Sequence, residues 1–330
     1  MATMSNSFRT ASAVITGTNH VLAGTPCQDS VAKYCNSKCC TIALSDGAGS
    51  RLYSNIGSSV ASKSAAKYVT EHFNELYDKS AEEVKDEILM NVRTSLYEVA
   101  VERNIEMRNF GCTLLIVGMD SETKKVLIFH VGDGLIFGCD CFGNTSLISS
   151  YDHQVADNVT ELITSKELKS CFLYRSKGEY IGFMLLSDGP ELLLKNNKQL
   201  AQAVMTISFL LPFKKLDEEY NSLFCGLTDD ASVITLVSND KIANVFKSGS
   251  KKMLSAVLGI SENIIKKRKD TYTQFLTAVS QRNVTVNEAV RILHQHNKNR
   301  MKDKLQPLIN SELVIYQNGK YILNKEYQSE

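Results

Sequence analysis

Long apolar runs are absent from this 330-residue sequence. None approaches the ~20 residues that a membrane-spanning helix needs. The segment 1–12 is polar, carries Arg9 as its single charge and lacks the apolar core of a signal peptide. We therefore expect a soluble, cytoplasmic protein without a membrane partner.

The sequence also lacks the cysteine pattern of a disulfide framework or of a zinc site. Its nine cysteines are an odd number in a long chain, which argues against a disulfide framework. Cys35, Cys39 and Cys40 lie close together, but no paired C-x-x-C and no nearby pair of histidines completes a zinc site. We expect reduced, mostly buried thiols instead.

A large net charge is absent because opposite charges in two parts of the chain cancel to +1. Residues 241–330 hold 16 basic and 7 acidic residues, whereas residues 1–240 hold 21 basic and 29 acidic residues. This asymmetry predicts two domains, 1–240 and 241–330, with different partners.

Aspartates recur at the ends of short apolar runs. Three runs end in Asp-Gly and a fourth run follows an Asp-Asp pair; the aspartates concerned are Asp46, Asp133, Asp188 and Asp229. A strand that stops at Asp-Gly places a carboxylate at its end, and the glycine permits a sharp turn. A single Asp-Gly pair is a common turn. Because the arrangement recurs at four strand ends, we predict that these carboxylates meet and bind metal.

The order of elements predicts an α+β fold, an α-β-β-α sandwich of two antiparallel sheets flanked by helix pairs. Strands are expected over 9–17, 30–34, 40–44, 111–118, 126–131, 135–140, 181–186 and 231–238, and helices over 54–77, 80–103 and 191–211. Ser80 and Glu83 form a predicted capping box. Residues 19–29 are expected to be a loop, and residues 150–177 an irregular insertion near the site.

Residues 241–330 predict a small winged helix-turn-helix-like domain. Helices are expected over 250–259, 270–280 and 298–310, and a capping box at Thr285 and Glu288 opens another. Asn318-Gly319 between two β-rich runs predicts a closing hairpin. Three helices and a hairpin are the order of a winged helix.

The basic residues of this part suggest two kinds of partner. Lysines and an arginine on the expected helix 298–310 suit the phosphates of nucleic acid, yet winged helices also dock proteins. The basic run 266–269 is expected before the domain, as a helix end or linker, with a nuclear signal as the alternative.

Carboxylate oxygens of this kind suit Mg²⁺ or Mn²⁺ better than zinc. Several carboxylates in one cleft repel one another unless divalent cations neutralise them. Two such ions ~4 Å apart lower the pKa of a bridging water and hold a phosphoryl group for in-line attack. This chemistry needs few other reactive side chains, because phosphoryl transfer depends mostly on positioning and charge neutralisation.

Six short motifs in this order resemble the motif series of the metal-dependent protein phosphatases of type 2C, in a form close to the bacterial variants. They are Gln28-Asp29, Ser45-Asp46-Gly47-Ala48-Gly49, Gly111-Cys112-Thr113-Leu114, Val131-Gly132-Asp133-Gly134, Ser187-Asp188-Gly189 and Asp229-Asp230-Ala231-Ser232. The resemblance covers roughly residues 10–238. It implies the same sandwich and a Mn²⁺- or Mg²⁺-dependent Ser/Thr phosphoprotein phosphatase that uses a two-metal-activated water.

The resemblance also implies roles for individual residues. Asp46 would bridge both ions, and the Gly47 carbonyl would bind one of them. Asp188 and Asp229 would hold the other ion, so Asp46 and Asp188 count as catalytic as well as metal-binding. Asp29 would act through water, and Asp133 with Asp188 would suit a third ion.

Three departures from the family pattern concern catalysis. Ala48 stands where many members have a histidine proton donor, and Gln28 stands where many have an acidic residue. The arginine that binds phosphate in many members is missing from residues 21–27. His20 lies in the same loop and is our candidate catalytic residue for either role, with a solvated loop histidine as the alternative.

The expected partners are a phosphorylated protein substrate, either a Ser/Thr kinase or its target, and a protein or nucleic acid bound by residues 241–330. Two rival functions stay open at this point. One is a pseudophosphatase that binds a phosphoprotein without turnover. The other is a DNA-binding regulator.

Overall fold

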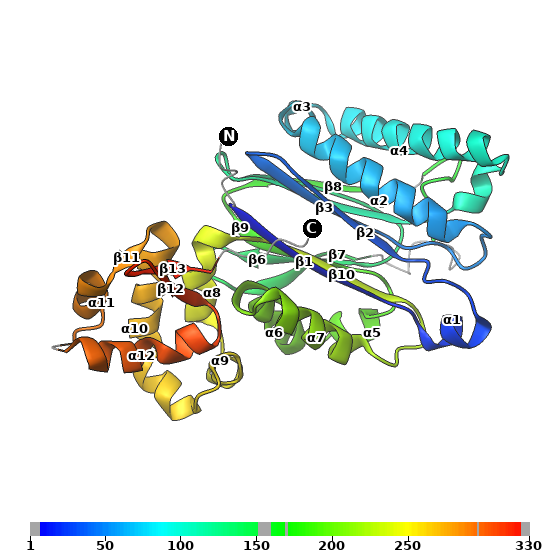
Figure 1. The fold of residues 1–330 in the computed structure, drawn as a ribbon. Helices are drawn as coiled ribbons and strands as arrows, with labels where there is room; N and C mark the ends of the chain where they lie inside the picture. The colour runs from blue at the N-terminus through cyan, green and yellow to red at the C-terminus, as the bar shows by residue number, and fades with distance from the viewer. Residues whose placement is uncertain (1–6, 151–159, 169–170, 296, 325–330) are drawn as a thin grey trace.

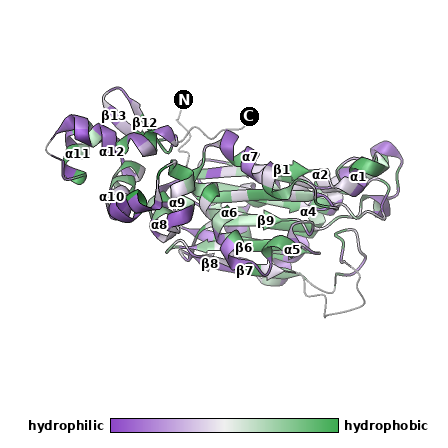
Figure 2. Ribbon diagram, turned by 90° about the horizontal axis from the view of Figure 1, so that it is seen from below, coloured by the Kyte–Doolittle hydropathy of each residue, from purple (hydrophilic) through white to green (hydrophobic). Residues whose placement is uncertain are grey.

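Two five-stranded antiparallel sheets lie face to face and carry helices on their outer sides (Figure 1). The computed structural model describes residues 7–150, 160–168, 171–295 and 297–324. The predicted α-β-β-α sandwich is therefore confirmed. Apolar residues dominate the strands, as the hydropathy colouring shows (Figure 2).

The first sheet has the strand order β1-β10-β9-β6-β7. Its strands are β1 (Phe8–Ile15), β10 (Ala231–Ser238), β9 (Tyr180–Leu186), β6 (Leu135–Asp140) and β7 (Thr145–Ser150). β1 pairs with β10 along its full length, from Phe8 opposite Ser238 to Ile15 opposite Ala231. The beginning and the end of the sandwich are thus neighbouring strands.

The second sheet has the order β2-β3-β4-β5-β8. Its strands are β2 (Ser30–Cys35), β3 (Cys39–Ser45), β4 (Leu114–Asp120), β5 (Lys125–Val131) and β8 (Phe172–Lys177). Side chains alternate along β3, so Ile42 and Leu44 pack against the first sheet while Ala43 packs against helices. Burial on both faces explains why the central strands read as continuous apolar runs.

Helices α2 (Ser54–Glu71), α3 (Phe73–Asp78) and α4 (Ala81–Arg103) cover the second sheet (Figure 1). Buried alanines on α2, such as Ala61 and Ala65, permit close packing on this sheet. The predicted capping box at Ser80 is present. The single helix expected over 54–77 is wrong in one respect, because the helix is interrupted at His72 between α2 and α3.

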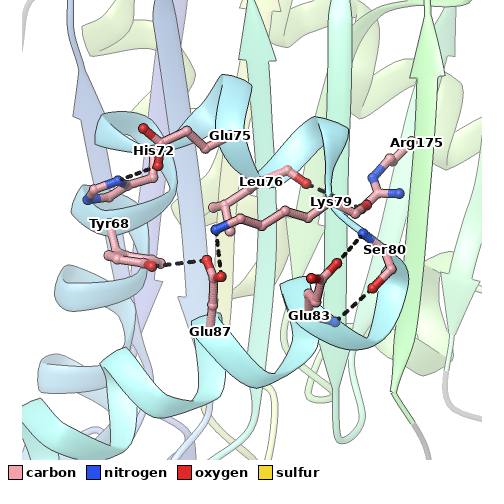
Figure 3. A network of polar contacts seen from close by, with 9 residues as sticks. All are labelled: Tyr68, His72, Glu75, Leu76, Lys79, Ser80, Glu83, Glu87 and Arg175. Carbon is pink, nitrogen blue, oxygen red and sulfur yellow. Dashed lines mark hydrogen bonds and ion pairs between the residues drawn. The ribbon is translucent and has the colours of Figure 1, made fainter.

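A network of polar contacts holds α3 and α4 in place (Figure 3). Arg175 on β8 donates hydrogen bonds to the carbonyls of Leu76 and Lys79, which lie at the C-terminal end of α3. The Lys79 ammonium in turn lies 2.5 Å from a carboxylate oxygen of Glu87 on α4. The two bonds from Arg175 satisfy carbonyls that the end of a helix leaves unpaired.

Helices α5 (Glu191–Leu194), α6 (Lys198–Leu210) and α7 (Phe213–Phe224) cover the first sheet. The mainly helical stretch expected over 191–211 is split, because Asn197 caps the N-terminus of α6. α7 was not predicted. Arg9 on β1, 3% exposed, donates to the carbonyls of Phe209 and Leu211 at the end of α6.

Three smaller expectations need correction. The expected loop 19–29 contains a short helix, α1 (Thr18–Ala23), and the stretch expected to be irregular over 150–177 contains β8. Residues 151–159 and 169–170 of that stretch lie outside the described residues. Cys35 and Cys40 face each other across β2 and β3 and form a disulfide, so the expectation of thiols is wrong for this pair.

The C-terminal part contains α8 (Ile242–Ser248), α9 (Lys251–Leu258), α10 (Glu262–Gln281), α11 (Val286–Ile292) and α12 (Lys298–Asn310). Strands β11 (Val284–Thr285), β12 (Val314–Gln317) and β13 (Lys320–Leu323) form a sheet of order β11-β13-β12. The expected helix 298–310, the hairpin and the capping box at Thr285 are confirmed. α10 begins earlier than expected, so the basic run 266–269 lies within a helix and not in a linker.

The apolar core is continuous between the C-terminal helices and the helices on the first sheet. Val245 and Phe246 of α8 share one buried cluster with Phe209 of α6 and Tyr272 of α10. No helix in the described part of the chain is both long enough and apolar enough to cross a membrane.

Candidate metal centre

Three aspartates from both sheets converge at one end of the sandwich. Asp46 follows β3, Asp133 lies in the turn between β5 and β6, and Asp188 follows β9. Each offers a carboxylate oxygen, and these oxygens lie within 4.8 Å of one another. Three of the four predicted strand-end carboxylates therefore form one group.

Asp46 is held by the motif Gly111-Cys112-Thr113, which directly precedes the neighbouring strand β4. The Thr113 N–H donates to the Asp46 carbonyl at 2.8 Å, and the Asp46 N–H donates to the Thr113 hydroxyl at 3.0 Å. The Ser45 hydroxyl donates to the Thr113 carbonyl at 2.6 Å. These bonds fix the backbone on both sides of the carboxylate, so this motif has a structural role that the sequence alone left unassigned.

Gly47 lies where no side chain fits. A Cβ atom there would come within 2.7 Å of the Ser54 carbonyl oxygen and 2.8 Å of the Gln28 carbonyl oxygen. Gly47 pairs with Cys112 in an isolated β-bridge whose hydrogen bonds run through Asp46 and Ala48. Its own carbonyl oxygen is therefore not used by the bridge and suits the predicted role as a ligand.

Asp133 is positioned by a buried histidine and by a threonine from a distant segment. His130 Nε2 lies 3.3 Å from the Asp133 carbonyl oxygen, and Nδ1 lies 2.8 Å from the Ser149 hydroxyl. Burial lowers the pKa of His130 to about 4, so the ring is neutral near pH 7. The Thr160 hydroxyl donates to Asp133 Oδ2 at 2.7 Å. Neither positioning residue was predicted.

Asp29 lies beside this group and is 7% exposed. Both of its carboxylate oxygens are buried without a hydrogen-bond partner among the described residues. Burial raises the pKa of Asp29 to about 7, and the negative charge of Asp230 adds to the rise. An unpaired buried carboxylate is costly, so a cation is the chemically fitting partner.

Repulsion among the carboxylates is visible in their pKa values. Burial, followed by the charges of Asp29, Asp188 and Asp133, raises the pKa of Asp46 well above its usual value. Burial and the charges of Asp133 and Asp229 raise the pKa of Asp188 to about 6. The donor set is all oxygen and strongly acidic, and it fits hard divalent cations.

The adjacent aspartates Asp229 and Asp230 make different contacts. Asp229 lies outside the group of three but close enough for its charge to act on Asp188. Asp230 is 3% exposed and accepts hydrogen bonds from the backbone N–H groups of Gly17 at 2.8 Å and Gln28 at 2.6 Å. Asp230 thus holds both ends of the loop 17–28, which carries His20, through hydrogen bonds. The sequence did not predict this role.

His20 lies on α1 and is 21% exposed. Its Nδ1 lies 2.8 Å from Asp230 Oδ1, so the imidazole is in contact with a buried carboxylate. The loop also touches the metal centre through its backbone, because the Gln28 carbonyl accepts from the Gly47 N–H at 3.1 Å. The arrangement brings the loop of His20 against the Asp46-Gly47 turn.

A family model described as "Protein phosphatase 2C" matches residues 16–220, well over half of the chain. The chain belongs to the protein phosphatase 2C family. The predicted resemblance is therefore confirmed at the level of the family.

Individual relatives of this phosphatase 2C chain are distant. Serine/threonine-protein phosphatase 3 of Escherichia coli (strain K12) is 27% identical over 133 residues, which is 39% of this chain and 52% of that protein. The match thus spans about half the length of this curated relative. A serine/threonine phosphatase of S. agalactiae is 17% identical, with a TM-score of 0.48, over 70% of this chain and 99% of that one. Phosphatase Stp1 from Staphylococcus aureus is 17% identical, with a TM-score of 0.47, over 69% of this chain and 94% of that one.

The metal-free form of this phosphatase 2C chain is expected to gain more stability from Mn²⁺ as the pH rises from 5 to 7.5. The pKa values of Asp29 and Asp188, about 7 and about 6, lie above the ~3.9 of an unfolded aspartate. The folded state therefore binds more protons than the unfolded state in this range, and its stability falls with rising pH. Metal binding removes that penalty, so the Mn²⁺-induced rise in melting temperature should increase with pH.

The measurement is thermal unfolding in EDTA and in Mn²⁺ across this pH range. His130 acts in the opposite direction, because its lowered pKa makes stability fall at low pH in both series. The difference between the two series removes that contribution. A metal-induced rise that is the same at pH 5 and pH 7.5 would contradict the prediction.

Proposed function

We propose that this chain is a metal-dependent phosphatase that removes phosphate from phosphoserine or phosphothreonine in proteins. The observation that carries the proposal is the group of Asp46, Asp133 and Asp188, whose carboxylate oxygens lie within 4.8 Å of one another at the ends of both sheets. The buried, unpaired carboxylate of Asp29 beside them supports it. Such a concentration of negative charge needs cations to be stable when ionised.

The family resemblance assigns residues to two Mn²⁺ or Mg²⁺ ions, and the grouping of Asp46, Asp133 and Asp188 supports this assignment. Asp46 would bind both, the Gly47 carbonyl one, and Asp188 with Asp229 the other. Asp29 would act through water, and Asp133 with Asp188 would suit a third ion. When bound, these ions supply the positive charge that neutralises the phosphate and makes a water acidic enough to attack it.

His20 is our candidate for proton transfer to the leaving hydroxyl, because Ala48 has no proton to give. Asp230 Oδ1 lies 2.8 Å from His20 Nδ1 and would hold the imidazole in place during proton transfer. An aspartate that holds the ring of a catalytic histidine is a recurring arrangement in hydrolases. Asp230 is thus a positioning residue for His20 and for the loop that carries it.

The C-terminal part is proposed to direct the phosphatase to its target as a winged-helix-like domain of residues 241–330. Lys298, Arg300 and Lys302 are exposed on α12. Lys304 differs, since its ammonium donates to the Leu293 carbonyl at 3.4 Å. The exposed cations suit an acidic or phosphorylated protein segment such as a Ser/Thr kinase or its target, and nucleic acid is the alternative partner.

The test is release of phosphate from phosphoserine and phosphothreonine peptides by the full chain with Mn²⁺, Mg²⁺ or EDTA. We expect turnover with either metal and none in EDTA. Peptide binding without phosphate release under any metal would overturn the proposal in favour of a pseudophosphatase. Binding to DNA that weakens steeply with salt, with no peptide turnover, would favour a DNA-binding regulator instead.

A further inference from the structure

The three most exposed large apolar side chains in the described part of the chain are leucines. Leu192 is 96% exposed, Leu22 is 86% exposed and Leu52 is 82% exposed. None of them belongs to a buried apolar cluster of the described residues, so core packing does not explain them. A single exposed leucine is common on protein surfaces, whereas a group of them at one place marks a binding surface. The position of the three leucines relative to one another is therefore decisive.

The three leucines lie in the segments that follow β1, β3 and β9. Leu22 is on α1, Leu52 is in the loop between β3 and α2, and Leu192 is on α5. Both views place α1 and α5 at the end of the sandwich that lies away from the C-terminal part (Figures 1 and 2). Asp46 and Asp188, which follow β3 and β9, come together at this end. The leucines therefore surround the end of the sandwich that carries the candidate metal centre.

Leu192 and Leu52 are close to the predicted metal ligands along the chain. The Glu191 N–H donates to the Asp188 carbonyl at 2.7 Å, so α5 starts directly beside Asp188. Leu192 follows Asp188 by four residues, which limits the distance between their Cα atoms to about 14 Å. Leu52 follows Asp46 by six residues, which sets the corresponding limit at about 21 Å.

Leu22 lies on a helix that the fold holds in place without burying it. α1 has no buried residue, and Val21 beside Leu22 is 64% exposed. A helix this short is not stable by itself. Asp230 accepts hydrogen bonds from both ends of the loop 17–28, and the Gln28 carbonyl accepts from the Gly47 N–H. The apolar side chains of α1 are thus fixed next to the metal centre and left open to solvent.

The location of the leucines indicates what covers them. A phosphorylated segment whose phosphate lies at the metal centre leaves the site in two directions. An extended chain advances by about 3.3 Å per residue, so side chains three to six residues from the phosphorylated one lie about 10–20 Å away. This range matches the limits set for Leu52 and Leu192.

We propose that Leu22, Leu52 and Leu192 bind apolar side chains on both sides of the phosphorylated residue of the substrate. This inference rests on the proposed phosphatase function and names its substrate class. The class is phosphoproteins in which large apolar residues flank the phosphoserine or phosphothreonine within an extended segment. Apolar contact is non-directional, so the leucines select for hydrophobic flanks and not for one exact sequence.

The deciding experiment compares two peptides of equal length and charge, with leucines or with serines on both sides of the phosphorylated serine. A methylene replaces the ester oxygen of the phosphoserine, so the full, Mg²⁺-loaded chain binds the peptide without hydrolysing it. By titration calorimetry, the wild type should bind the leucine peptide at least about 10-fold more tightly than the serine peptide. A triple variant with Leu22→Ser, Leu52→Ser and Leu192→Ser should bind both peptides equally.

The matched control is the double variant Met90→Ser and Val101→Ser. Both side chains are exposed on α4, Met90 by 73% and Val101 by 62%, and α4 covers the outer side of the second sheet. This variant should keep the preference of the wild type. Substitutions at exposed positions change stability little, so all variants should be folded, and thermal unfolding checks this.

Turnover of ordinary phosphoserine peptides gives a second readout. The ratio of kcat/KM for the leucine peptide to that for the serine peptide should be at least about 10 in the wild type and in the control. It should fall to about 1 in the triple variant, because its surface no longer distinguishes the two peptides.

Two results would overturn the inference. One is a wild type that binds both peptides equally or binds neither, and the other is a triple variant that keeps the preference. Self-association of the wild type that the triple variant loses, without a peptide preference, would assign the leucines to a second copy of the chain. The two proposals fail separately. Leucine-dependent binding without turnover would overturn the phosphatase function alone, and turnover without a leucine preference would overturn this inference alone.

Discussion

Replacing Asp46 by asparagine is expected to abolish phosphate release, by at least about 10³-fold, and to make the metal-free protein more stable. The two effects have one cause. The pKa of Asp46 is raised well above its usual value by burial and by the charges of Asp29, Asp188 and Asp133. Asparagine keeps the size of the side chain but removes one charge from the group. It therefore relieves repulsion in the empty site and removes the ligand expected to touch both ions.

Thermal unfolding of Asp46→Asn at pH 7.5 in EDTA measures the relief of repulsion in the empty site. The same measurement in Mn²⁺ measures the loss of the metal ligand. Asp46→Asn should be more stable than the wild type in EDTA, because it removes one charge from a group whose repulsion raises the pKa of Asp46. It should lose most of the stabilisation by Mn²⁺. Asp217→Asn, on the exposed surface of α7, is the control and should change neither quantity. A less stable metal-free Asp46→Asn protein, or one still fully stabilised by Mn²⁺, would contradict this account.

Asp230→Ala is expected to lower kcat by about 100-fold while leaving metal binding largely intact. Asp230 accepts hydrogen bonds from the backbone of Gly17 and Gln28 and contacts His20. Its loss frees both ends of the loop and leaves two buried N–H groups without acceptors. The free energy of unfolding should fall by about 2–4 kcal/mol.

Urea unfolding measures the expected loss of stability of Asp230→Ala. Steady-state kinetics at saturating Mn²⁺ measure its expected loss of kcat. The control is Asp240→Ala just beyond the other end of β10, where Asp240 is half-exposed and pairs with Lys124 and Lys241. That variant should keep its kcat. If Asp230→Ala abolished Mn²⁺ binding as completely as Asp46→Asn, Asp230 would be a ligand and the assignment of Asp229 would be wrong.

The sequence was sufficient for the layers of the fold and for the convergence of Asp46, Asp133 and Asp188, because both depend on local patterns. Alternation of apolar residues identifies strands, and Asp-Gly marks where Asp46, Asp133 and Asp188 leave them. Once the fold class is known, the order of the antiparallel strands predicts that these strand ends lie close together.

Interactions between residues far apart in sequence were not predictable in this way. Asp229 and Asp230 are adjacent and chemically identical, and only the position of the loop 17–28 distinguishes their roles. The helix break at His72 was missed because the periodicity of the apolar residues does not show it.

The pairing of β1 with β10 has a consequence for how the protein is made. β1 is an edge strand, and β10 is its only neighbour in the sheet formed by the described strands. A ribosome must therefore synthesise almost the whole sandwich before β1 can join a sheet. Asp230, which fixes the loop that follows β1, immediately precedes β10 in the chain. Contacts so distant in sequence form late in folding. The nascent chain therefore lacks the hydrogen bonds that fix the loop 17–28 until the sandwich closes.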